Sequence, residues 1–128
     1  MTISIDCVTN DGVGESVFGQ QDVILSGDSN RCLSEQIDAI NFRLRTSPIG
    51  YVSDYHVAGD PTLLIILQGS LRLILPSGDS RSFQSGDMFI AEDYLQANCD
   101  FVAGLHGHKA EVIGNQELRA IHLKLRRR

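Results

Sequence analysis

The sequence lacks the features that mark several classes of protein. It has no tryptophan, only three prolines and three cysteines, and its longest apolar run is Leu63–Leu67. That run is far shorter than the ~20 residues that a membrane-spanning helix needs. An odd number of cysteines without a Cys-x-x-Cys pair fits neither a disulfide framework nor a thiolate zinc site. The first residues show no basic segment followed by an apolar stretch, so we expect a cytoplasmic protein without a secretory signal.

Positive charge is also scarce. The 128 residues include 11 lysines and arginines against 16 aspartates and glutamates, which gives a net charge of −5. Such a chain has no general attraction to phosphate backbones or anionic membranes, so we expect neither nucleic acid nor a membrane among its partners. The length and the apolar share of 42% indicate a single globular domain.

Short apolar stretches separated by twelve glycines predict an all-β fold. Ile40–Arg45 alternates apolar and polar residues, which predicts one face on a core and one in water. Leu63–Leu67 is apolar throughout, and we expect it to be covered on both sides. Further strands are expected at Ser16–Phe18, Val23–Leu25, Leu71–Leu75, Ser82–Gln84, Met88–Ala91, Lys109–Ile113 and Leu118–Leu125.

The polar, glycine-rich first part of the chain differs from the rest. We expect residues 1–36 to form an N-terminal arm that packs on residues 37–128 or on a partner subunit. The only stretch that favours a helical turn is Cys32–Ile37, with Ser34 as its cap.

One segment in the middle of the chain has a recognisable spacing. Gly50 is followed by five residues, then His56-Val57-Ala58, three residues, Thr62, six residues and Gly69. This spacing resembles the first motif of the cupin superfamily, which reads G, five residues, H-x-H, three or four residues, E, six residues, G. Ala58 and Thr62 stand where the motif has its second histidine and its glutamate.

A later segment is similar to the second cupin motif. Gly86–Ala91 resembles its opening strand, and after an inserted loop, Asp93–Leu105, the segment Gly107–Gly114 resembles its histidine, here His108, and the strand that follows. The resemblance covers about residues 37–125. It implies an antiparallel double-stranded β-helix, the cupin jelly-roll barrel, with an N-terminal arm.

What the resemblance implies for function is a barrel that binds a small molecule. The expected ligand-binding residues are His56, His108, Tyr51, Asp54 and Thr62. Metal-binding cupins hold one divalent ion with the histidines and glutamate of the two motifs, and two of those four positions are substituted here. His106 shares its spacing with His108, so His56, His106 and His108 are the expected ligands of a metal such as iron, zinc, nickel or manganese.

Alternatives to a pure binding protein remain open. One is a metal-dependent dioxygenase or isomerase. Another is a metal-free enzyme resembling the sugar epimerases of the cupin type, with His56 and Asp54 as the base and Tyr51, Tyr55 or Tyr94 as the acid. A third is a regulatory sensor module. The sequence does not decide whether the protein is an enzyme.

Four further expectations concern the surroundings of this site and the assembly of the protein. The pair Glu92-Asp93 is expected to form a solvated turn, and the apolar loop Asp93–Leu105 is expected to act as a lid or a dimer contact. His122 lies on the opposite parity from its apolar neighbours, so we expect it to be exposed or structural. We expect a homodimer in which the N-terminal arm crosses to the second subunit.

Overall fold

The computed structural model describes residues 1–127, and every regular element in that range is a β-strand. The all-β fold class expected from the sequence is therefore confirmed. Arg128, the last residue of the expected barrel, lies outside the described residues. No helix in the described part of the chain could span a membrane.

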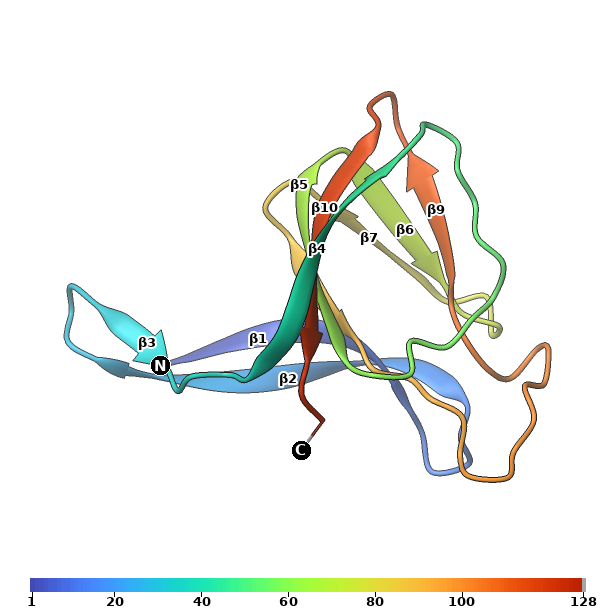
Figure 1. Ribbon diagram of the computed structural model, residues 1–128, viewed down its shortest axis with the longest axis horizontal. Helices are drawn as coiled ribbons and strands as arrows, with labels where there is room; N and C mark the ends of the chain where they lie inside the picture. Colours follow the sequence, from blue (N-terminus) through green and yellow to red (C-terminus); the bar gives the residue numbers. More distant parts are fainter. Residues whose placement is uncertain (128) are drawn as a thin grey trace.

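The strands form two sheets that face each other and close into a jelly-roll barrel (Figure 1). The larger sheet contains, in spatial order, β3 (Cys32–Ser34), β2 (Ser16–Gly27), β1 (Thr2–Asn10), β8 (Met88–Ala91), β5 (Thr62–Gln68), β10 (Leu118–Leu125) and β4 (Ala39–Ser47). The smaller sheet contains β7 (Ser80–Gln84), β6 (Ser70–Ile74) and β9 (Lys109–Ile113). The described pairs are antiparallel except β1 with β8, which run parallel.

The core lies between the two sheets. Alternate residues of β5, β6, β8 and β9 point inward, as the two-residue period of a strand requires. Their buried side chains include Leu64, Ile66, Leu71, Leu73, Phe89 and Val112. The aromatic rings of Phe83 and Phe89 lie 4.6 Å apart in this core.

The expectation that Leu63–Leu67 is covered on both sides is wrong at its end. Leu64 and Ile66 point into the core and are buried, whereas Leu67 is 53% exposed on the outer face. A continuous apolar run therefore marks a strand with an apolar outer face, not a strand enclosed on both sides.

Strand β4 has the predicted alternation but the opposite orientation. Its apolar residues Ile40, Phe42 and Leu44 are 51%, 65% and 75% exposed, while Arg45 and Ser47 turn toward the barrel interior. Periodicity separates the two faces of a strand without saying which one is inside. At β4 the polar face is inside.

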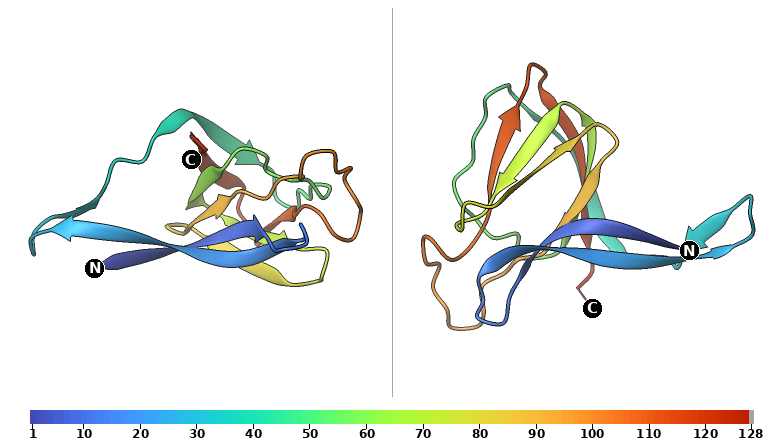
Figure 2. Two further views of the ribbon diagram at one scale, coloured as in Figure 1. Left: turned by 90° about the horizontal axis from the view of Figure 1, so that it is seen from below. Right: turned by 180° about the vertical axis from the view of Figure 1, so that it is seen from behind.

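The first 36 residues form a long hairpin and a short third strand. β1 joins the large sheet by pairing with β8, and the whole of β1 pairs with β2. The far end of β2 and the whole of β3 project beyond the barrel (Figure 2). The predicted helical turn at Cys32–Ile37 is wrong, because Cys32–Ser34 pairs with β2 as a strand after the turn closed by Asp28 and Arg31.

Candidate functional site

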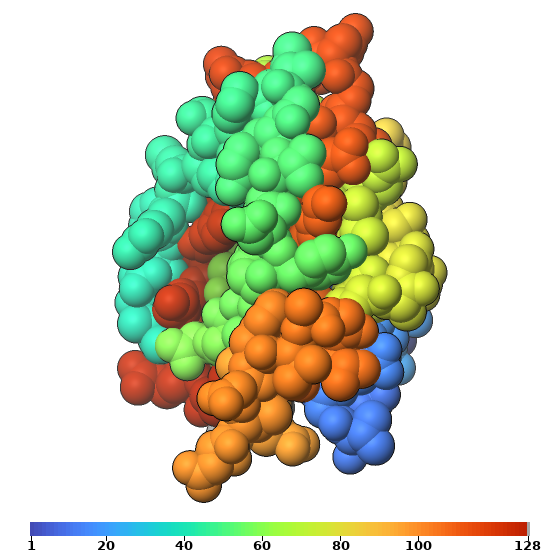
Figure 3. Space-filling model, turned by 90° about the vertical axis from the view of Figure 1, so that its right-hand side faces the viewer, coloured from blue at the N-terminus to red at the C-terminus, as the bar shows by residue number. Residues whose placement is uncertain are grey.

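An open cavity of about 530 Å³ lies between the sheets at one end of the barrel. Its floor is apolar and is built by inward residues of four strands, namely Leu64, Leu71, Leu73, Phe89, Ala91 and Ala110. Its walls are polar and include Arg45, Ser47, Tyr51, Ser53, His56, Thr62, His108 and His122. Figure 3 shows the molecule hollowed between β4 and the segment 48–58, with atoms of β10 at the bottom of the hollow.

The segment 48–58 is held as a wall of the cavity by β9. Ser53 N–H donates to the Ala110 carbonyl at 2.8 Å, and Ser53 Oγ accepts from Ala110 N–H at 2.9 Å. Val112 N–H donates to the Tyr51 carbonyl at 2.8 Å. These hydrogen bonds to β9 fix the segment that carries Tyr51, Ser53 and His56, although the segment itself is not a regular strand.

His56 and His108 are brought together by their backbones. Each donates its N–H to the carbonyl of the other, at 3.1 and 2.9 Å, which makes an isolated antiparallel bridge. Side chains of directly opposite residues share one face of such a pair, and the two rings lie with centroids 4.6 Å apart. The sequence-based pairing of His56 with His108 is therefore present in the structure.

A buried carboxylate orients His108. Asp93 is fully buried, and its Oδ2 accepts from Nδ1 of His108 at 3.1 Å and from the Ser16 hydroxyl at 2.9 Å. Its Oδ1 accepts from Ala58 N–H at 3.1 Å. Because an ionised carboxylate only accepts, Nδ1 of His108 carries the proton and Nε2 is the nitrogen left for a ligand.

This arrangement corrects two expectations. Asp93 does not belong to a solvated turn, because its side chain is buried. Of the pair Glu92-Asp93, only Glu92 is partly exposed. The expected His56 and Asp54 pair is also not formed through the carboxylate, because Nδ1 of His56 donates to the Asp54 backbone carbonyl at 2.9 Å. An imidazole fixed by a buried carboxylate is the arrangement of a general base, and here the residues that adopt it are His108 and Asp93.

His106 is not part of the cavity. Its Nδ1 accepts from Val102 N–H at 2.9 Å, and its buried ring lies 6.1 Å from that of Phe101. The three histidines expected as metal ligands are therefore not brought together, because His106 packs inside the loop while His56 and His108 face the cavity. Among the described residues no three histidine, cysteine or acidic side chains are placed to hold a metal ion.

The remaining expected residues divide between the cavity and the surface. Tyr51 and Thr62 line the cavity, whereas Asp54 is exposed and does not. Tyr55 and Tyr94 lie outside it, with Lys109 and Arg127 respectively placed over their rings. None of residues 94–105 lines the cavity, and the loop lies beside the turn between β1 and β2 (Figure 1).

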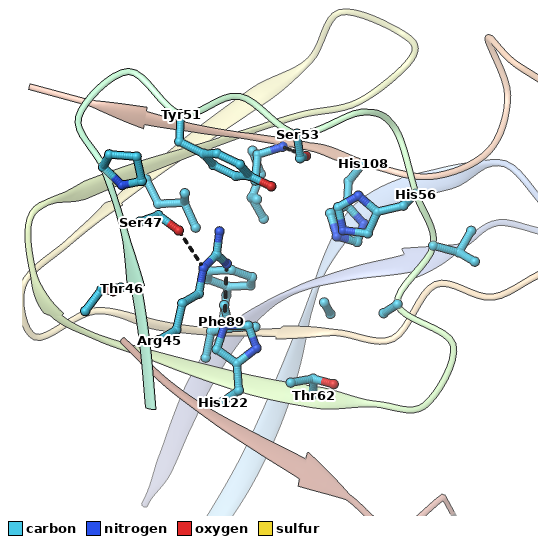
Figure 4. Close-up of a pocket in the computed structure, with 18 residues that line it drawn as sticks. Arg45, Thr46, Ser47, Tyr51, Ser53, His56, Thr62, Phe89, His108 and His122 are labelled. Carbon is cyan, nitrogen blue, oxygen red and sulfur yellow. Dashed lines mark hydrogen bonds between the residues drawn. The ribbon is translucent and has the colours of Figure 1, made fainter. Parts of the chain in front are cut away.

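Sequence reasoning missed Arg45, and it did not place His122, expected to be exposed or structural, in the cavity wall. Both side chains are half-buried in the cavity wall, and Figure 4 places them together opposite His56 and His108. Burial lowers the pKa of His122, and the positive charges of Arg45 and Arg43 lower it further. His122 is thus a neutral wall residue. Parity groups Arg45 with Ser47 on one face of β4, but it does not show that this face is the inner one.

The fold and the cavity define an all-β jelly-roll barrel that is open at one end. No family model matches the chain, and no curated protein matches it. Among solved structures the chain is similar to the cupin domain of Schizosaccharomyces pombe Cnp3, with a TM-score of 0.47 and 12% sequence identity. The match covers 96% of this chain and 87% of that chain.

Proposed function

We propose that this protein binds a small polar organic molecule in the cavity of its barrel. The observation that carries the proposal is the convergence of polar side chains from separate parts of the chain on one open cavity with an apolar floor. A concave, largely apolar site with a few placed polar groups is the usual form of a small-molecule site. His56 and His108 stand at one end of it and Arg45 and Tyr51 at the other (Figure 4).

The donor set does not fit the metal that the cupin resemblance implies. Ala58 and Thr62 offer a methyl and a hydroxyl group at two ligand positions, and His106 is held by Val102. His56 and His108 are left with one free nitrogen each, and two imidazoles fall short of the three protein ligands usual even in open catalytic zinc sites. We therefore derive no chemistry through a metal and propose a site built from the chain's own side chains.

A metabolite screen by thermal unfolding tests the proposal. A ligand at 100 times its Kd should raise the Tm by roughly 8–10 °C for a domain of this size. The variant Thr62→Phe, which places a ring in the cavity, should lose this response. The matched variant Leu67→Phe adds a ring to the outer face of the same strand and should keep it. A hit that stabilises both variants equally would place binding outside the cavity, and a broad screen without hits would remove the proposal.

We also propose that the protein forms a homodimer through the outer face of its large sheet. The strand registers align apolar residues in two rows across that face. One row is Leu44, Ile121, Ile65 and Met88, and the other is Phe42, Leu123, Leu63 and Ile90. Ile90 is buried with Ile5 and Cys7 of β1, whereas Phe42 and Leu44 are exposed. The rows thus continue from a covered region into an uncovered one.

A second copy fits this surface better than an unrelated partner. The projecting arm exposes Ile24 and Leu33, and among the described residues its strands pair there only with one another, β1 with β2 and β2 with β3. In a two-fold pair each arm would meet the exposed rows of the other chain, so that the assembly closes.

Light scattering should give twice the monomer mass of 14.1 kDa at micromolar concentration. Phe42→Lys should shift the mass toward the monomer because it places a charge in the interface. Val13→Lys alters another exposed apolar residue, at the β1–β2 turn, and should leave the dimer intact. A monomer mass for the unaltered protein would overturn the proposal and leave the apolar rows for a different partner.

A further inference from the structure

The guanidinium of Arg45 stands in the cavity without a counter-ion. Its Nε donates to Ser47 Oγ at 3.0 Å, and its Nη1 lies 3.5 Å from Nε2 of His122. No acidic side chain lines the cavity, and among the described residues Arg45 forms no ion pair. On a chain with a net charge of −5, this leaves one uncompensated positive charge inside the barrel.

Because Arg45 is half-buried, its charge loses part of its hydration, and this is costly unless another group neutralises the charge. Burial lowers the pKa of Arg45, which records that cost, although a guanidinium keeps its proton at any physiological pH. The neighbouring groups do not supply the missing charge. Ser47 and Tyr51 are neutral, and His122 is a neutral acceptor for Nη1 because burial and two arginines lower its pKa.

The positions of these groups also leave part of the guanidinium free. Ser47 accepts from Nε and His122 faces Nη1, so the planar guanidinium is held in one orientation. Its Nη2 has no protein partner among the described residues. The ring of Tyr51 lies beside it, with its centroid 5.8 Å from the guanidinium carbon. Figure 4 shows the guanidinium turned toward the middle of the cavity between Tyr51 and Phe89.

We propose that the cavity binds an organic monocarboxylate, with its carboxylate on Arg45 and its apolar part over the floor formed by the leucines and Phe89. The inference rests on the proposed binding function and names its ligand class. A guanidinium matches the planar carboxylate and forms charge-assisted hydrogen bonds with it. A phosphate dianion is a poorer fit, because the cavity offers one arginine, no lysine and no helix N-terminus.

The apolar floor limits the ligand further. A hydrocarbon or aromatic body would contact the apolar floor formed by Leu64, Leu71, Leu73 and Phe89. A second carboxylate at the far end would meet two imidazoles and no further fixed positive charge. A neutral polar group on the ligand is therefore the partner we infer for Nε2 of His56 or of His108.

The test uses pairs of probes that differ only in charge. Acetate, hexanoate, phenylacetate and phenylpropionate are titrated by calorimetry at pH 7.5 beside their primary amides, with inorganic phosphate as a further probe. At least one carboxylate should bind roughly 10- to 100-fold more tightly than its amide, which is the usual worth of a charged hydrogen bond. Arg45→Met should bring that ratio close to one. Arg43→Met, the same change at an exposed arginine of the same strand that does not line the cavity, should preserve it.

The remaining outcomes separate this inference from the proposed function. Amides that bind as well as acids, or phosphate that binds best, would overturn the monocarboxylate and leave the cavity as a binding site. Neutral hits from the metabolite screen with no carboxylate among them would do the same. If no compound of any class binds, both proposals fail. Arg45→Lys keeps the charge but loses the planar guanidinium, so its ratio of carboxylate to amide affinity should be intermediate. This variant also serves as a control in case Arg45→Met does not fold.

Discussion

Replacing Asp93 with alanine is expected to lower the free energy of unfolding by about 3 kcal/mol, measured by urea denaturation. The carboxylate is fully buried and accepts hydrogen bonds from Ser16 Oγ, His108 Nδ1 and Ala58 N–H. Its removal leaves the buried donors of Ser16 and His108 and the partly buried Ala58 N–H without this acceptor. The same change releases the ring of His108, so ligand binding in the cavity should weaken as well.

The adjacent carboxylate supplies the matched control. Glu92 is partly exposed and accepts one hydrogen bond, from Gln21 Nε2 at 2.8 Å. Glu92→Ala should therefore cost less than about 1 kcal/mol. Asp93→Asn keeps the shape and the Oδ1 acceptor but loses the charge, and it should fall between the two. Equal costs for Asp93→Ala and Glu92→Ala would contradict the buried network.

Replacing Gly107 with alanine should cost about 3 kcal/mol for a different reason. Gly107 has φ of +88°, and a Cβ at this position would lie 2.9 Å from backbone N, C and O atoms of His56. Those atoms belong to the bridge between His56 and His108, so neither side can move without breaking it. The substitution should separate the two imidazoles and impair ligand binding together with stability.

Gly104 provides the comparison that isolates the steric effect. Its φ of +92° is nearly the same, but a Cβ there would meet nothing within 4 Å. Gly104→Ala should thus show only the backbone cost, about 1 kcal/mol. Unfolding curves that displace both variants by the same amount would mean that the close approach of Gly107 to His56 is not present in solution.

Much of the fold follows from local patterns. A turn that contains Gly78 joins β6 and β7 as a hairpin, and both β6 and β9 show inward residues at every second position. The resemblance of the segments Gly50–Gly69 and Gly107–Gly114 to the cupin motifs predicts His56 and His108 as site residues, and both line the cavity. These features depend on period and spacing, which the sequence displays directly.

The missed features depend on which face of an element is inside. Ile40–Arg45 alternates cleanly, yet its apolar side faces outward, so Arg45 could not be assigned to the cavity from pattern alone. Asp93 follows a short strand and lies next to another acidic residue. Nothing in the local sequence shows that Ser16, 77 positions earlier, donates a hydrogen bond to it. His106 was grouped with His108 by spacing, but the positive φ of Gly107 turns the chain between them.

The central claim is that the barrel cavity is the binding site, and calorimetry of the best ligand from the screen tests it most directly. We predict one molecule bound per chain, no detectable binding to Thr62→Phe, and unchanged binding to Leu67→Phe. Binding to Thr62→Phe with the affinity of the unaltered protein would contradict the account.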